Sequence, residues 1–96
     1  IVCHVGATVN YLMPYAFMRE ANVLGTLEVL KLMCRGKSKV LHYFSTTSIT
    51  KSENRNEVPV SYSLSELSQL GGYNQTKFVA ETLVLNAAKK GLSVVI

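Results

Sequence analysis

Three short apolar runs, separated by longer segments with helical spacing, limit what this chain can fold into. The runs are IVCHV at residues 1–5, KVLHYF at 39–44 and LSVVI at 92–96. Apolar runs of this length, rich in β-branched and aromatic residues, are typical of strands buried in a parallel sheet. Because each pair of runs encloses enough residues for a crossover helix, the pattern predicts an α/β fold with the order β-α-β-loop-α-β.

The segments between the runs carry the signals of helices. Pro14 suits a first helical turn, and the helix that it begins is expected to end near Cys34. Apolar residues recur in it at the helical period, namely Val23, Leu27, Leu30 and Cys34. A second helix is predicted from Tyr73 to Lys90. Before it, the polar stretch 51–72 predicts a long loop with one helical turn near 64–70, and a loop this long is commonly functional.

The composition predicts a folded domain and excludes several classes of site. Of the 96 residues, 48% are hydrophobic and 17% are charged, which suits one domain or part of one. All acidic residues are Glu, so Asp-based triads, EF-hand loops and paired-Asp metal sites are excluded. The net charge of +4 gathers locally only at residues 31–39, which is too little for a nucleic-acid-binding stripe. This basic group predicts a solvated helix end, with contact to an acidic carrier protein as the weaker alternative.

Cys3 and Cys34 lie in apolar stretches without a CxxC spacing. This argues against a disulfide scaffold or a zinc site, and predicts two small core residues in a protein of the reducing cytosol. The sequence has no apolar run near the ~18 residues of a membrane span and no basic leader before its first apolar run. Because it also opens directly on a strand-like run, we expect it to be part of a longer protein.

A Tyr and a Lys four residues apart, Tyr73 and Lys77, give the sharpest chemical signal. Residues at this spacing share a helix face, about 5–6 Å apart at Cβ. A Lys ammonium there can bind a ribose and lower the pKa of the Tyr hydroxyl from its usual ~10. Such pairs are also common as ordinary surface neighbours. The Ser/Thr cluster at 45–48 favours function here, since ligands of open parallel sheets bind beyond the carboxyl ends of the strands.

Four segments in this order resemble a known family: HVGATVNYLMPY, NVLGTLEVL, FSTTSI and GGYNQTKFVAE. They are similar to the extended short-chain dehydrogenases/reductases, and among these to the thioester reductase domains of carboxylic acid reductases, aminoadipate reductase and nonribosomal peptide synthetases. The match covers nearly the whole chain. The sequence departs from the family where Ser and Trp are expected, because Thr76 and Phe78 stand there. These departures leave the Tyr/Lys pair intact and loosen the assignment to the subfamily.

The resemblance implies a role for each matching side chain. Tyr73 would be the general acid for the oxygen that develops charge during hydride delivery, and Lys77 would bind the nicotinamide ribose and tune Tyr73. Thr46 would supply the active-site hydroxyl, at the second position of the family's S-[S/T]-x-x-V pattern, with Ile49 at the Val position. Thr47 is the alternative, because a shift of one residue would exchange the two.

The resemblance also implies a cofactor and a domain. Asn22 matches a helix Asn associated with the active site, and Gly6 and Ala7 fall where the first strand's end approaches the dinucleotide. The implied cofactor is NADPH, the implied partner and substrate an acyl thioester on a carrier protein, and the implied product an aldehyde or alcohol. The chain nowhere contains the family's GxxGxxG turn. Residues 1–96 are therefore expected to be the central part of one doubly wound Rossmann-type NAD(P)-binding domain, without its Gly-rich turn and its C-terminal substrate part.

Other interpretations stay open at this point. Asn22 and Thr46 can be polar residues that only satisfy the backbone or pack, and His4 and His42 are expected to be packed or hydrogen-bonded. The same motifs also occur in sugar-nucleotide epimerases or dehydratases and in hydroxysteroid-type dehydrogenases. A hypothesis of another class is a non-catalytic fragment. Strands that are apolar on both faces need cover on both, so the isolated chain is expected to self-associate.

Overall fold

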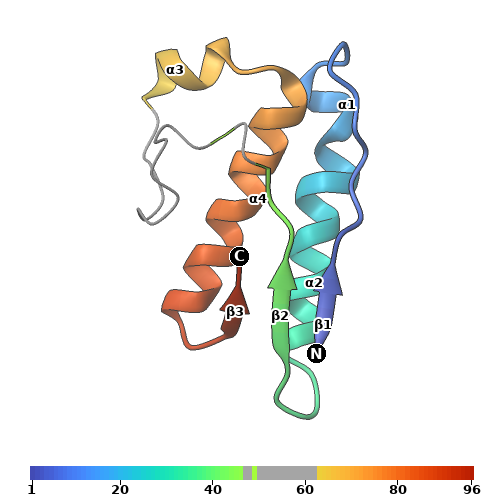
Figure 1. The fold of residues 1–96 in the computed structure, drawn as a ribbon, viewed down its shortest axis with the longest axis vertical. Helices are drawn as coiled ribbons and strands as arrows, with labels where there is room; N and C mark the ends of the chain where they lie inside the picture. The colour runs from blue at the N-terminus through green and yellow to red at the C-terminus, as the bar shows by residue number, and fades with distance from the viewer. Residues whose placement is uncertain (47–48, 50–62) are drawn as a thin grey trace.

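A parallel sheet of three short strands forms one layer of the computed structural model, which describes residues 1–46, 49 and 63–96 (Figure 1). The strands are β1 (Val2–His4), β2 (Val40–Tyr43) and β3 (Ser93–Val95). The strand order is β1-β2-β3, and both pairings are parallel. The predicted strands and the α/β class are therefore confirmed, each strand being shorter than its apolar run.

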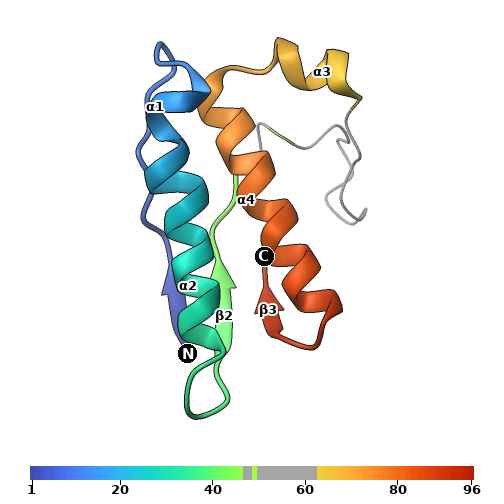
Figure 2. The same cartoon turned by 180° about the vertical axis from the view of Figure 1, so that it is seen from behind.

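The first crossover is one long helical segment (Figure 2), and its winding changes in its middle. It consists of α1 (Tyr15–Arg19), the π-helix η1 (Glu20–Leu24) and α2 (Gly25–Met33). The N–H of Gly25 donates to the carbonyl of Glu20, five residues earlier, which is the bonding of a π-helix. The predicted helix is thus present, and it contains a π-helical turn that the apolar spacing did not indicate.

The second crossover ends in the long helix α4 (Gly72–Lys89), which the structure places one residue from its predicted bounds. The short α3 (Leu64–Gln69) precedes it and begins with a capping box, in which the side chains of Ser63 and Glu66 each bond the other's backbone N–H. This confirms the predicted helical turn, whereas residues 50–62 of the predicted loop lie outside the described residues. None of the helices in the described ranges is long and apolar enough to cross a membrane.

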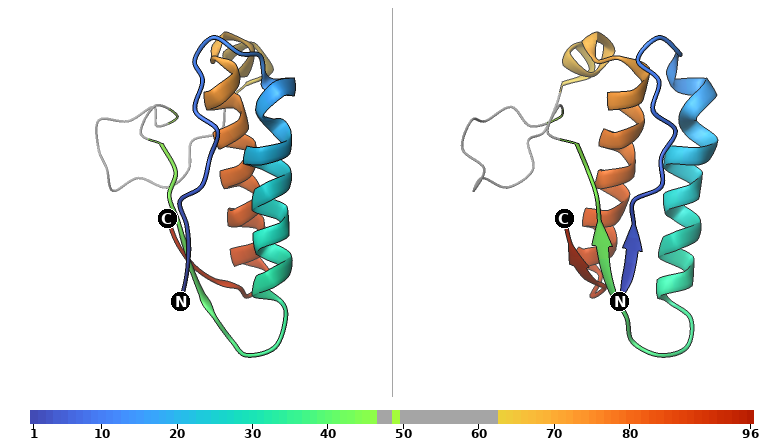
Figure 3. Two further views of the ribbon diagram at one scale, coloured as in Figure 1. Left: turned by 90° about the vertical axis from the view of Figure 1, so that its right-hand side faces the viewer. Right: turned by 45° about the vertical axis from the view of Figure 1, so that its right-hand side comes forward.

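Both crossover helices lie on the same face of the sheet (Figure 3). Side chains alternate along each strand, so that Leu41 and Tyr43 of β2 face the helices and are buried. The buried core residues between sheet and helices are Leu30, Met33, Leu41, Tyr43, Ala80 and Val84. The core is therefore a single layer that fixes α2 and α4 against the strands.

No described helix covers the other face of the sheet, and this corrects the prediction for the cysteines. Cys3 of β1 points to that open face and is exposed, together with Val40 and Val95 of the neighbouring strands. Cys34 is exposed as well, because α2 ends one residue before it and Met33 takes the buried position of the last turn. Both thiols are free, and the cytosolic location stays a prediction.

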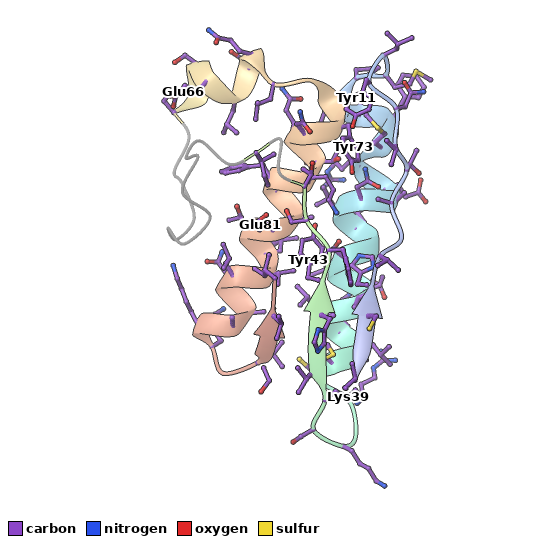
Figure 4. The ribbon with its side chains drawn as sticks, viewed as in Figure 1. Tyr11, Lys39, Tyr43, Glu66, Tyr73 and Glu81 are labelled. Carbon is purple, nitrogen blue, oxygen red and sulfur yellow. The ribbon has the colours of Figure 1, made fainter. Side chains whose placement is uncertain are left out.

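The start of α4 is in close contact with the chain that leads into α1. A Cβ placed on Gly72 would lie 2.5 Å from the Met13 carbonyl oxygen and from the Tyr15 amide nitrogen. Gly72 is therefore required by a backbone-to-backbone approach rather than by a turn. This approach fixes the first turn of α4, and with it the next residue, Tyr73, at the carboxyl edge of the sheet (Figure 4).

Candidate active site

Tyr73 lies in the first turn of α4, beyond the carboxyl ends of the strands (Figure 4). Its side chain is 8% exposed. Its ring meets that of Tyr11 edge to face, with centroids 5.4 Å apart and an interplanar angle of 72°. Burial raises the pKa of Tyr73, and the neighbouring Tyr11 adds to the rise. The phenol therefore stays protonated at neutral pH and can donate a hydrogen bond or a proton.

Lys77 follows one helical turn later and is buried, with 6% exposed. Its Nζ donates to the carbonyl oxygen of Phe44, just beyond β2, at 2.7 Å. The same nitrogen lies 4.7 Å from the centroid of the Tyr43 ring, in a cation–π contact. Burial lowers the pKa of Lys77, and the negative charge of Glu81 opposes this shift. Lys77 therefore ties α4 to the end of β2.

This arrangement differs from the tuning of Tyr73 that was predicted for Lys77. A lowered pKa was expected at Tyr73, whereas burial and Tyr11 raise it. Burial of the phenol is the main cause of the rise, while the Lys77 ammonium is bound to the Phe44 carbonyl and the Tyr43 ring. The expectation of a lowered pKa was wrong for this structure, and the contact of Lys77 with a ribose stays a prediction.

The segment that leaves β2 brings hydroxyl groups to the same edge of the sheet. The Ser45 hydroxyl donates to a carboxylate oxygen of Glu81 on α4. Thr46 follows directly and is half-buried, and Ile49 is buried with 5% exposed. Thr47, the alternative to Thr46, lies outside the described residues, so the choice between the two hydroxyls stays open.

Asn22 is buried in η1, and its amide group holds the loop after β1. Its Oδ1 accepts from the Thr8 amide at 2.7 Å, and its Nδ2 donates to the Thr8 carbonyl at 2.9 Å. The same Nδ2 donates to the Thr76 hydroxyl at 3.0 Å. Asn22 is thus buried rather than solvent-facing, and its side-chain amide makes these three hydrogen bonds. It joins the loop after β1, the π-helical turn and α4, and a direct part in catalysis stays a prediction.

Thr76 shows why its departure from the family's Ser leaves the local geometry intact. Its hydroxyl accepts from Asn22 and donates to the Tyr73 carbonyl oxygen at 2.6 Å. A Ser hydroxyl can make the same pair of hydrogen bonds, so Thr changes the packing by one methyl group only. The bond to Tyr73 links the backbone of the first turn of α4 to Asn22.

Gly6 and Ala7 are exposed in the loop between β1 and Thr8. A Cβ placed on Gly6 would meet no described atom within 4 Å, and its φ lies outside the left-handed region. The fold of the described residues therefore does not itself require glycine there. An open backbone at a strand end is what close approach of a ligand needs.

His4 is confirmed as a hydrogen-bonded histidine. The Thr26 hydroxyl donates to the Asn22 carbonyl at 2.8 Å, so it accepts from His4 Nε2, which lies 3.0 Å away. Burial lowers the pKa of His4, and the positive charge of Lys77 adds to the effect. A neutral imidazole with its proton on Nε2 satisfies this contact.

The basic group at residues 31–39 lies at the opposite, amino edge of the sheet, where Figure 4 labels Lys39. Lys39 donates to the carbonyls of Arg35 and Lys37 in the turn before β2, and Lys31 pairs with Glu28 at 2.9 Å on the surface of α2. This confirms a solvated helix end. The alternative, contact of this group with an acidic carrier protein, stays a prediction.

Several residues of the candidate site at the carboxyl edge were not predicted. Glu81 stands one turn after Lys77 on α4 and binds Ser45. Its spacing was visible, since a Glu at i+4 from a Lys shares its helix face. Tyr11 and Tyr43 contact Tyr73 and Lys77 respectively. Both contacts join residues far apart in the sequence, so no local spacing could have indicated them.

Comparison with known proteins gives concordant matches. The whole chain, residues 1–96, matches an NAD-binding family described as Male sterility protein. Aldehyde reductase lnaA of Aspergillus flavus is 38% identical over 105 residues, which cover 100% of this chain and 10% of that protein. Nonribosomal peptide synthetase asaC of the same fungus is 38% identical over 104 residues, with the same coverage of 100% and 10%.

A solved structure matches as well. The crystal structure of the terminal R domain from the myxalamid PKS-NRPS biosynthetic pathway is 47% identical, with a TM-score of 0.77, over 96% of this chain and 24% of that chain. The chain thus spans about a tenth of the length of the two curated relatives. The resemblance stated from the sequence segments and the Rossmann-type fold are confirmed.

Proposed function

The chain belongs to the NAD-binding family described as Male sterility protein, and from this membership we propose that the protein carrying it reduces acyl thioesters with a nicotinamide cofactor. The observation that carries the proposal is the buried pair Tyr73 and Lys77, on one face of α4 at the carboxyl edge and beside the segment that leads to Thr46. Relatives named as an aldehyde reductase, a nonribosomal peptide synthetase and a terminal R domain support it.

The residues at this edge fit a nicotinamide cofactor, which when bound supplies a hydride. The open backbone at Gly6 and the small Ala7 would allow its close approach beyond β1. Lys77 would donate to ribose hydroxyls from the same edge. The preference for NADPH over NADH is part of the proposal and rests on the resemblance to thioester reductases.

Two side chains would act on the reacting carbonyl. Tyr73, protonated because its pKa is raised, would donate to the thioester oxygen as that oxygen gains negative charge. Thr46 would donate a second hydrogen bond, with Thr47 as the alternative. Addition of a hydride and a proton gives a tetrahedral adduct. When the adduct collapses, its C–S bond breaks and the carrier thiol leaves with a proton, so that an aldehyde is formed.

The direct test uses the full-length protein with an acyl-phosphopantetheine thioester and either NADPH or NADH. We expect cofactor oxidation, thiol release and aldehyde in equal amounts, and faster turnover with NADPH. A second round of oxidation without further thiol release would identify reduction to the alcohol. If neither cofactor is oxidised and no thiol appears, the proposed reaction is wrong.

We also propose that the isolated 96-residue chain associates with itself through the open face of the sheet. Val40 at the centre of that face and Val95 at its edge are 37% and 50% exposed, and apolar faces of this kind are commonly buried by association. Light scattering after size exclusion should give a mass above 10.6 kDa. The variant Val40→Lys should shift the chain toward the monomer.

The matched control is Leu32→Lys, because Leu32 is 48% exposed on α2 and lies off the sheet. This variant should associate as the unchanged chain does. A monodisperse monomer of the unchanged chain, with cooperative unfolding, would contradict the proposal. So would an equal effect of both substitutions.

A further inference from the structure

Glu81 binds the end of β2 from the next turn of α4 after Lys77 (Figure 4). It is half-buried, and it accepts a hydrogen bond from the Ser45 hydroxyl. Lys77 donates at the same place to the carbonyl of Phe44, the residue before Ser45, at 2.7 Å. Two residues one helical turn apart therefore hold two consecutive residues of the chain that leaves β2.

These two contacts bear on the candidate hydroxyl. Thr46 directly follows Ser45 in the sequence. The hydrogen bond that holds Ser45 therefore also restricts the position of the Thr46 backbone. Tyr73 and Lys77 belong to the same helix as Glu81. The contact from Glu81 to Ser45 thus holds the segment after β2 in place against the helix that carries the Tyr/Lys pair.

We propose that Glu81 is a positioning residue, which holds the Ser45 hydroxyl and thereby fixes the segment leading to Thr46 relative to Tyr73 and Lys77. The proposal rests on the proposed function for its catalytic consequence, whereas the contact itself can be tested without any reaction. Misplacement of a reacting group by about 1 Å can lower a rate about 10²-fold, so loss of this contact is expected to be visible in turnover.

Glu81 also supplies charge to the group around Lys77. Among the described residues, the titratable groups near Lys77 are His4 on β1, Tyr43 on β2, and Tyr73 and Glu81 on α4. The Glu81 carboxylate favours the charged ammonium and opposes the lowering of the pKa of Lys77 by burial. Glu81→Gln keeps an oxygen that can accept from Ser45 and removes this charge. The pKa of Lys77 should therefore fall further in this variant, and the ammonium should be lost at a lower pH.

The first experiment measures the contact by thermal unfolding of the full-length protein. Ser45→Ala and Glu81→Ala should each lower the melting temperature by roughly 2–4 °C. The double variant should melt no lower than the less stable single variant, because both substitutions remove the same bond. Losses that add in the double variant would overturn the proposal. Glu81→Gln should melt close to the wild type.

The second experiment measures the consequence for hydride transfer. Ser45→Ala and Glu81→Ala should lower kcat about tenfold or more with little change in the KM for the nicotinamide cofactor. Glu81→Gln should keep most of kcat at its optimum, with the alkaline limb of its pH profile moved to lower pH. An unchanged kcat in Glu81→Ala, or a Glu81→Gln variant as slow as Glu81→Ala with an unmoved limb, would overturn the positioning role.

The control is Glu28→Gln, since Glu28 is an exposed helix residue that pairs with Lys31 far from the carboxyl edge. It should change neither kcat nor the pH profile. If the wild type oxidises no cofactor with any acyl thioester, the proposed function is wrong. The unfolding experiment still decides whether Glu81 holds Ser45, so the two failures are distinguishable.

Discussion

The Tyr73→Phe variant of the full-length protein should reduce acyl thioesters about 10²–10⁴-fold more slowly than the wild type, because a general acid contributes rate in this range. The substitution removes only the phenolic oxygen. The ring stays in its contact with Tyr11, so the fold should not change. Single-turnover oxidation of the cofactor with a bound acyl thioester measures the effect directly.

The matched control for this variant is Tyr15→Phe, which removes a hydroxyl from α1, outside the candidate site. It should react at the wild-type rate. Cofactor affinity, measured by fluorescence titration, should be close to wild type in both variants. A Tyr73→Phe protein that reacts as fast as the wild type would show that Tyr73 is not the proton donor.

The raised pKa of Tyr73 determines how its contribution to the reduction rate changes with pH. Burial and Tyr11 raise this pKa above its ordinary value of ~10. A general acid acts in its protonated form, so the rate that depends on Tyr73 should be full at neutral pH and fall only as the pH rises through the raised pKa. Because burial lowers the pKa of Lys77, loss of its ammonium should set the first alkaline limb, and this limb should persist in Tyr73→Phe.

The Gly72→Ala variant should lose about 3 kcal/mol or more of stability, because the new Cβ would overlap backbone atoms. Those atoms are the Met13 carbonyl oxygen and the Tyr15 amide nitrogen, each 2.5 Å from the Cβ position. A backbone cannot turn aside as a side chain does, so α4 or the chain before α1 would have to shift. Thermal unfolding of the full-length protein should show a fall of roughly 6–12 °C.

Gly71→Ala is the control for this prediction. Gly71 precedes the helix at φ −64, and a Cβ there would meet no described atom within 4 Å. Glycine is a better N-cap than alanine, so this substitution should cost about 1 kcal/mol or less, well below the cost expected at Gly72. In the absence of a clash, Ala at Gly72 would even be stabilising, because Ala is the better helix former. Equal melting temperatures for the two variants would contradict the close approach.

The elements of the fold could be predicted because local signals mark them. The apolar runs that became β1, β2 and β3 stand between helices whose spacing and terminal glycines are readable from the sequence. The π-helical turn η1 could not be predicted in this way. The wider π-helical turn contains Asn22, which bonds both Thr8 and Thr76. These contacts join residues far apart in the sequence, so local spacing does not indicate them.

The burial of the strands was predicted less well than their position. An apolar run identifies a strand, but it does not indicate which face of the sheet the helices will cover. Within the described residues, helices cover one face only, which leaves Cys3 and Val95 exposed while Leu41 is buried. The expectation that the cysteines are core residues failed for this reason.

The Tyr/Lys pair could be predicted because it is local, with both residues on one turn of α4. The direction of the Lys77 ammonium could not, since it depends on the Phe44 carbonyl, which lies 33 residues earlier in the sequence. The same holds for Glu81 and Ser45, which are separated by 36 residues. Local spacing thus indicates the chemistry of this edge, and long-range pairing sets its electrostatics.

The two hydrogen bonds between the Asn22 amide and the backbone of Thr8 resemble those that a neighbouring strand would make. Thr8 has left the sheet, and it is exposed together with Gly6 and Ala7. An exposed segment normally loses conformational entropy when a ligand orders it, and this loss weakens binding. Here the Asn22 side chain already holds the segment at Thr8 in place before any ligand binds. If the proposed dinucleotide contact at Gly6 and Ala7 is made, the dinucleotide would meet a preorganised surface, and more of its contact energy would remain as affinity.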